Sequence, residues 1–114
     1  MNAMLLSEVI DKLGLEQRAG GSPEGIEVTG GYSSDLLSDV IGNGKPGQIW
    51  TTIQIHQNVV AVGTLLGLAA IVITGGAEPE EKTIEKANEE GVIILTTPMR
   101  TYEVVGKLYE LGIR

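Results

Sequence analysis

The sequence contains no cysteine and no phenylalanine, and one tryptophan and three tyrosines are its only aromatic residues. The lack of cysteine excludes disulfides, thiolate metal sites and cysteine nucleophiles. The shortage of aromatic residues leaves the core to aliphatic side chains and provides no evident platform for stacking nucleic-acid bases. Basic residues are also scarce, since eight Lys and Arg stand against fifteen Asp and Glu, for a formal net charge of −7. Such a surface repels nucleic acid and anionic membranes, so neither is an expected partner.

The common signatures of catalytic and cofactor sites are missing as well. There is neither a Gly-Lys-Ser/Thr phosphate loop nor a GxGxxG dinucleotide fingerprint. His56 is the single histidine, and its neighbours Gln57 and Asn58 are neither metal ligands of choice nor proton carriers. The simplest interpretation of His56 is a hydrogen-bonding loop residue, and we retain it as a candidate ligand contact. No catalytic residue, metal site or cofactor is predicted, and the chain is not expected to be an enzyme.

The length of 114 residues corresponds to one domain. We assign residues 4–114 to that domain and interpret residues 1–3 as a frayed end or a cloning remnant. No basic start is followed by an apolar run, so no signal peptide is predicted. The most apolar stretch, residues 59–73, is shorter than the roughly 20 residues that a spanning helix needs. Together these features predict a cytoplasmic protein.

Strand-like and helix-like patterns alternate along the chain. Apolar residues at helical spacing predict helices over residues 5–13, 34–41, 59–66, 79–88 and 101–111. Runs of β-branched residues predict strands over residues 26–28, 48–55, 70–73 and 92–95. Such alternation is typical of right-handed βαβ units. The predicted fold class is therefore α/β, with one mainly parallel sheet of about four strands flanked by helices.

Two Thr-Gly-Gly turns, at residues 29–31 and 74–76, follow strand-like runs. Glycine lets the backbone turn sharply and leaves amide N–H groups open at a helix start. The simplest interpretation of both turns is geometric, with glycine where the chain needs a positive φ. Glu78, Glu80 and Glu81 follow the second turn closely and would repel a phosphate. An anion is therefore expected to bind more readily at the first turn.

Ligands in open parallel sheets bind at the carboxyl ends of the strands. The hydroxyl, amide, imidazole and bare backbone groups expected to converge there belong to Thr29, Gly30, Gly31, Gln54, His56, Asn58, Thr74, Gly75, Gly76 and Thr97. Because these groups are neutral, we expect weak binding of a small polar ligand, with little dependence on salt.

Residues 28–113 resemble a stand-alone DRTGG domain, and the resemblance extends over nearly all residues from Met4 onward. Its strongest part runs from Thr51 through Gly76 to Thr97. The motif that gives the family its name is matched in part, as Glu-Val-Thr-Gly-Gly at residues 27–31, without the arginine. The family is in turn similar to the N-terminal domain of HPr kinase/phosphorylase, an α/β domain outside the catalytic part of that enzyme.

The resemblance implies a regulatory or accessory role. Related domains lie beside CBS pairs in regulatory proteins and in nucleotide-regulated pyrophosphatases, often at dimer interfaces. Free-standing versions are encoded near iron-only hydrogenase genes, which implies a role accessory to hydrogenase or redox metabolism. The family supplies no established catalytic residues, so none is carried over to this sequence.

Three functional hypotheses remain open. The leading one is a non-catalytic regulatory module that binds a small polar ligand, such as an adenine nucleotide, at the strand carboxyl ends. The second is a purely structural homodimerisation domain without a ligand. The third, a phosphotransferase, is weaker because Lys45, Lys82 and Arg100 are scattered and no pair of aspartates accompanies them.

A homodimer is expected from residues 59–68. The apolar members of this stretch are Val59, Val60, Ala61, Val62, Leu65, Leu66 and Leu68, and they lie on nearly every side of a helix. A small domain of two packed layers covers part of such a helix, so the rest needs a partner. A twofold copy is the usual solution for a self-complementary patch.

Overall fold

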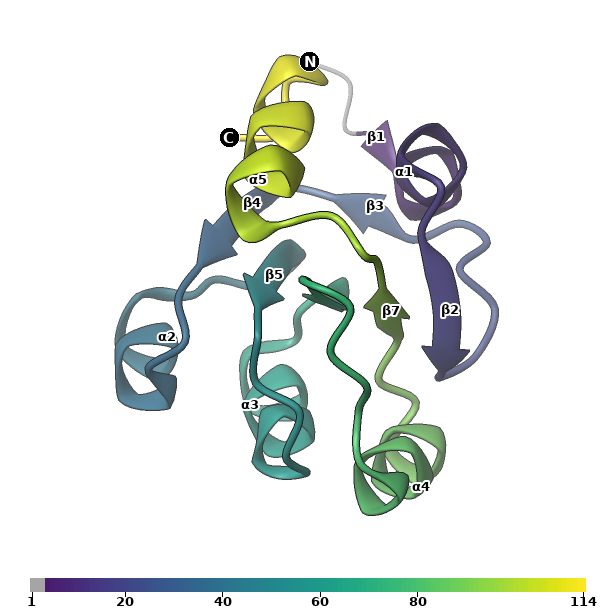
Figure 1. Cartoon of the computed structure of the whole chain (residues 1–114), viewed down its shortest axis with the longest axis vertical. Coiled ribbons are helices and arrows are strands. Elements are labelled where there is room, and N and C mark those ends of the chain that lie inside the picture. The colour runs from purple at the N-terminus through teal and green to yellow at the C-terminus, as the bar shows by residue number, and fades with distance from the viewer. Residues whose placement is uncertain (1–3) are drawn as a thin grey trace.

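The computed structural model describes residues 4–114, which form one layered α/β unit (Figure 1). The elements in chain order are β1 (Met4–Leu5), α1 (Leu6–Leu13), β2 (Glu16–Ala19), β3 (Glu27–Val28), β4 (Gly30–Ser33), α2 (Leu37–Asn43), β5 (Gln48–Thr52), α3 (Asn58–Leu66), β6 (Ala70–Ile73), α4 (Glu81–Glu90), β7 (Ile94–Thr96) and α5 (Thr101–Glu110). Within this described part, none of the helices is long and apolar enough to cross a membrane.

The main sheet has the strand order β2-β7-β6-β5-β4. Strands β4, β5, β6 and β7 are mutually parallel, and β2 adds an antiparallel edge beside β7. The predicted α/β class with a mainly parallel sheet is confirmed. The antiparallel strand β2 was not predicted, because its sequence Glu-Gln-Arg-Ala has neither β-branched residues nor a clear alternation.

Helices cover both faces of this sheet (Figure 1). One apolar cluster joins α1 and α5 to one face, through residues such as Val9, Val104 and Val72. The other cluster joins α2, α3 and α4 to the opposite face, around Trp50 and Ile71. Successive strand residues alternate between the two clusters, as expected for a parallel sheet that is buried on both sides.

Several predicted boundaries are wrong by a few residues. Strand β5 ends at Thr52 rather than at residue 55, and α4 begins at Glu81 rather than at Pro79. Trp50 lies fully inside the core, where its indole N–H donates to the Ser34 carbonyl at 2.8 Å.

The first Thr-Gly-Gly segment is not a strand-to-helix turn, and this prediction is wrong. Thr29 connects β3, which belongs to a separate two-stranded sheet with β1, to β4 of the main sheet. Gly30 and Gly31 begin β4 and pair with the first residues of β5, so they lie at the amino edge of the parallel strands. Neither glycine has a positive φ.

A close approach of backbone explains the glycine at position 30. A Cβ built on Gly30 would lie 2.6 Å from the carbonyl oxygen of Arg114. That carbonyl also accepts a hydrogen bond from the N–H of Gly31 at 3.3 Å. Glycine in a strand often marks such a passage of a second backbone segment. The pair Gly30-Gly31 therefore lets residues 113–114 dock against β4.

Substitution of Gly30 by alanine should lower the free energy of unfolding by about 1–3 kcal/mol, because the new methyl group must displace the backbone of residue 114. The matched control is Gly106→Ala in the interior of α5, where a Cβ meets no atom within 4 Å. Its higher helix propensity should raise stability by about 1 kcal/mol. Urea unfolding followed by circular dichroism measures both changes, and a Gly30→Ala protein as stable as the wild type would contradict the close approach.

Candidate ligand site at the carboxyl edge of the sheet

The loops that leave the parallel strands bring part of the predicted site together. Strands β4, β5, β6 and β7 end at Ser33, Thr52, Ile73 and Thr96. The predicted site residues that follow β5, β6 and β7 lie on this carboxyl side, namely Gln54, His56, Asn58, Thr74, Gly75, Gly76 and Thr97. Thr29, Gly30 and Gly31 lie at the opposite edge, so their predicted place beside the other residues is wrong.

The second Thr-Gly-Gly segment makes the expected turn, but its amides are not open. Gly75 and Gly76 have φ values of 72° and 75°, which favour glycine. The Gly75 N–H donates to the Met99 carbonyl at 2.8 Å, and the Gly76 N–H donates to the Thr97 carbonyl at 3.0 Å. These two bonds join the loop after β6 to the loop after β7. The amides that were predicted to lie open at this turn are therefore occupied.

The threonine hydroxyls of this edge are also hydrogen-bonded within the protein. Thr74 Oγ1 and Thr101 Oγ1 lie 2.6 Å apart, which joins the residue after β6 to the first residue of α5. Thr97 Oγ1 accepts from the Met99 N–H at 3.1 Å, and Thr83 Oγ1 donates to the Ile55 carbonyl at 2.6 Å. These hydroxyls hold the loops in place, so they are poorly available to a ligand.

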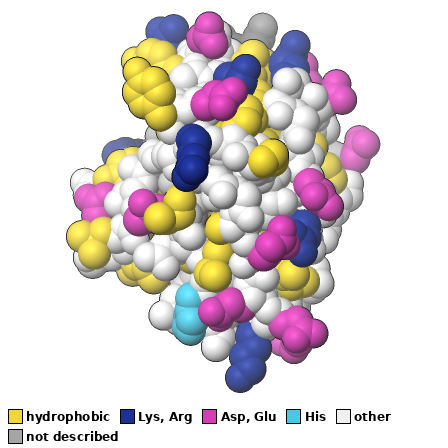
Figure 2. Space-filling model, viewed as in Figure 1, with side chains coloured by type: hydrophobic (Ala, Val, Ile, Leu, Met, Phe, Trp, Pro, Cys, Tyr) yellow, Lys and Arg dark blue, Asp and Glu magenta, His cyan; other side chains and the backbone are white. Residues whose placement is uncertain are grey.

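His56 has a local structural role at the start of α3. Its Nδ1 accepts a hydrogen bond from the Asn58 N–H at 3.2 Å, so the imidazole satisfies a donor of the first helical turn. Asn58 itself is the first residue of that helix. His56 itself is exposed and is the cyan side chain in Figure 2.

Asp35 is the organising residue that sequence reasoning missed. Its Oδ1 accepts hydrogen bonds from the Thr52 hydroxyl and from the Ile53 N–H, both at 2.8 Å. The Gln54 side chain returns to the same segment, because its Nε2 donates to the Asp35 carbonyl at 2.9 Å. One carboxylate thus joins the loop after β4 to the loop after β5. The available signal was an aspartate at the start of the helix predicted over residues 34–41, since aspartate often accepts backbone hydrogen bonds at such a position.

Substitution of Asp35 by alanine should lower the free energy of unfolding by about 1–3 kcal/mol, because it removes an ionised acceptor of two hydrogen bonds. Thermal unfolding measures the loss. Glu89→Ala, an exposed glutamate of α4, is the control and should change stability by less than about 0.5 kcal/mol. Equal stabilities of the two variants would show that the carboxylate does not join the loops.

The side chains left accessible near this edge include a cation and large apolar groups. Arg100, in the loop after β7, places Nη1 3.9 Å from the position that a Cβ on Gly75 would take. Tyr102 in the first turn of α5 is 93% exposed, and Ile53 after β5 is 54% exposed. Arg100 looked isolated in the sequence, but the bond between Gly75 and Met99 brings its loop to the glycine turn.

The electrostatics of the edge are mixed. Glu78, beyond the glycine turn, forms an ion pair with Arg18 of β2, and this hydrogen bond is the main reason why the pKa of Arg18 is raised. A hollow of about 230 Å³ beside the turn is lined by Gly76, Thr97 and Pro98, together with the acidic Glu16 and Glu78. Figure 2 shows acidic and basic side chains interspersed over the visible face. An anion would therefore bind on the side of Arg100 rather than in this hollow.

Among residues 4–114 there is no cluster of three or more His, Cys, Asp or Glu side chains that could hold a metal ion. The residues of the carboxyl edge offer one guanidinium, exposed apolar groups and a rigid, internally bonded backbone. This set can bind and orient a small molecule.

The described residues thus form a small α/β domain whose loop polar groups gather at the carboxyl edge of a parallel sheet. The family model of the DRTGG domain matches residues 26–111, and the chain belongs to that family. Comparison with curated protein sequences finds no match.

The chain also shares its fold with part of a solved structure. The chain is similar to the CBS and DRTGG domains of the regulatory region of Clostridium perfringens pyrophosphatase, a structure complexed with the activator diadenosine tetraphosphate. The TM-score is 0.70 and the sequence identity 17%, over 87% of this chain. The match spans 43% of the length of that structure's chain. The likeness establishes a shared fold.

Proposed function

We propose that this protein is a non-catalytic regulatory module that binds an adenine nucleotide at the carboxyl edge of its sheet. Its family membership and the fold shared with a nucleotide-activated regulatory region support this role. The observation that carries the proposal is the position of Arg100 beside the exposed Gly75 turn, with Tyr102 close by in the chain. A role accessory to hydrogenase or redox metabolism belongs to the same proposal.

The chemistry of the edge assigns a part of the nucleotide to each group. The planar guanidinium of Arg100 matches a phosphate, which it can contact with two parallel hydrogen bonds. The exposed ring of Tyr102 offers a stacking surface for adenine. Because the amides of Gly75 and Gly76 are occupied, a phosphate has no glycine nest to enter. Binding should therefore depend on Arg100 and be weak, with a modest response to salt.

Titration calorimetry with AMP, ATP and diadenosine tetraphosphate tests this proposal. Arg100→Gln should weaken binding about tenfold or more, since a hydrogen bond to a charged group contributes about 1.5–3 kcal/mol. Lys107→Gln, which removes an exposed cation of α5 outside the edge, is the matched control and should bind as the wild type does. The proposal fails if none of the three nucleotides binds at concentrations of about 1 mM, or if the two variants bind alike.

A second candidate role is homodimerisation through α3, and a specific surface favours it. The structure buries Val59, Val60 and Val62 of this helix but leaves Leu65 68% exposed. A groove of about 330 Å³ runs between α3 and α4, with Val60, Ala61 and Leu65 on one side and Lys86 and Glu90 on the other. The distance from Lys86 Nζ to Glu90 Oε2 is 4.0 Å, so the two side chains form an ion pair along α4. In a twofold dimer, Lys86 would meet the partner's Glu90 and Leu65 would enter the opposite groove, so the surface is self-complementary.

Sedimentation equilibrium distinguishes this arrangement from a monomer. The wild type should be a dimer at micromolar concentrations, and Leu65→Glu should be a monomer because it places a charge at the centre of the apolar contact. Leu36→Glu alters a leucine of similar exposure, 64%, outside α3 and should remain dimeric. A monomeric wild type at high micromolar concentration would exclude the α3 dimer and would leave the nucleotide proposal untouched.

A further inference from the structure

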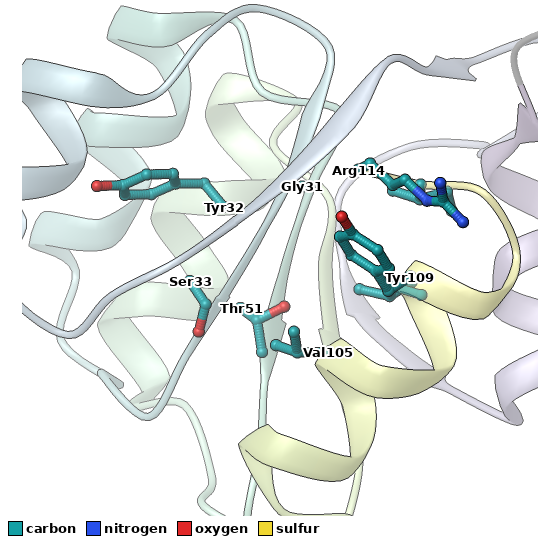
Figure 3. Close-up of a pocket in the computed structure, with 9 residues that line it drawn as sticks. Gly31, Tyr32, Ser33, Thr51, Val105, Tyr109 and Arg114 are labelled. Atoms are coloured by element: carbon teal, nitrogen blue, oxygen red, sulfur yellow. The ribbon is translucent and has the colours of Figure 1, made fainter.

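A separate pocket lies on the flank of the sheet, between the edge strand β4 and helix α5 (Figure 3). Its volume is about 190 Å³, room for about six water molecules at roughly 30 Å³ each. Val105, Leu108 and Ile113 form an apolar wall, and Gly31 and Ser33 form the opposite wall. None of these residues belongs to the nucleotide site proposed above.

Thr51 is the unusual residue of this pocket. It is 1% exposed, and its side chain points into the pocket between β4 and Val105 in Figure 3. The side-chain hydrogen bonds found for residues 4–114 include those of Thr52, Thr74, Thr83 and Thr97 but none for the hydroxyl of Thr51. Among the same residues, no polar side-chain atom sealed from solvent lacks a partner. The Thr51 hydroxyl therefore opens into the pocket, where it is available as both donor and acceptor.

The hydroxyl of Thr51 lies on a sheet face that is otherwise apolar. Along β5 the side chains of Ile49 and Thr51 share the face that α1 and α5 cover, and Ile49 belongs to the apolar cluster of that face. A β-branched aliphatic residue such as valine would satisfy the same strand geometry at position 51. Residue type and geometry together point to a polar group held at the base of an apolar pocket, as in many small-molecule sites.

A cation lies at the rim of the pocket. The guanidinium of Arg114 stacks over the ring of Tyr109, 4.6 Å from the ring centroid, and both residues line the pocket. The Arg114 carbonyl is fixed by the Gly31 N–H, so this residue is anchored through its backbone as well as its side chain. Ser33, which is the register partner of Thr51, adds a second hydroxyl on the β4 side.

We propose that the pocket between β4 and α5 binds a small organic acid with a compact branched or aromatic apolar body. The body would lie against Val105, Leu108 and Ile113. One oxygen of the acid would accept a hydrogen bond from the Thr51 hydroxyl, and the negative charge would be drawn by Arg114 at the rim. Because the pocket holds few non-hydrogen atoms, the affinity should lie in the millimolar to high micromolar range.

Chemical-shift titration of the ¹⁵N-labelled protein tests this proposal with two matched probes, 3-methylbutanoate and its neutral amide. Both should shift the amide signals of residues 31–33, 51 and 105–109, and the carboxylate should bind several-fold more tightly than the amide. Thr51→Val should weaken both probes about three- to tenfold, the effect of one hydrogen bond. Arg114→Gln should weaken the carboxylate alone, so the two probes should then bind alike.

Two further variants make the result decisive. Thr64→Val, on the exposed side of α3, is the matched control for Thr51→Val and should bind both probes as the wild type does. Val105→Phe fills the pocket from a half-buried helix position and should abolish binding, which keeps the test available if Thr51→Val does not fold. The proposal is overturned if neither probe shifts the pocket signals at about 20 mM. It is overturned equally if the shifts are scattered outside the pocket or survive Val105→Phe. Loss of nucleotide binding by Arg100→Gln, with probe binding retained, would confirm that the two sites are independent.

Discussion

Burial of β6 on both faces of the sheet is the constraint on which the rest of this structure depends. Every residue of Ala70–Ile73 is buried, with Val72 in the cluster under α1 and α5 and Ile71 in the cluster under α2, α3 and α4. A strand in this position has no place for a polar side chain, so β6 can contribute to a site only through the residues beyond its ends. The absence of phenylalanine strengthens this constraint, because the core must be filled by many small aliphatic side chains and one tryptophan.

Hydrogen bonds join the loops beyond the strands to one another and hold them in place. Backbone and side-chain bonds join the loop after β6 to the loop after β7, and the Asp35 carboxylate joins the two loops on the other side. Such a closed network fixes the geometry of the edge but uses the donors that a ligand would otherwise receive. A ligand at this edge would therefore meet the side chains that reach outward, such as Arg100 and Tyr102.

Sequence patterns predicted the fold class, the parallel strands β5, β6 and β7 and the helices between them, because β-branched runs and helical spacing report burial directly. They placed residues 29–31 at the wrong edge, because Thr-Gly-Gly reads as a turn and the reason for glycine at position 30 is a contact with residue 114. Strand β2 was not predicted for a similar reason, because its extended geometry comes from pairing with β7 and not from the propensity of its own residues. The sequence likewise placed Gly75 and Gly76 correctly but did not reveal that Met99 and Thr97 occupy their amides.

Both edges of the main sheet are completed by segments distant in the chain. Strand β2, near the start, pairs with β7, and β4 receives the backbone of Arg114 against Gly30 and Gly31. A chain emerging from the ribosome cannot form either contact until residues 94–114 have been synthesised. The sheet is therefore completed last by contacts between segments that are distant in the chain, a topology typical of slower folding.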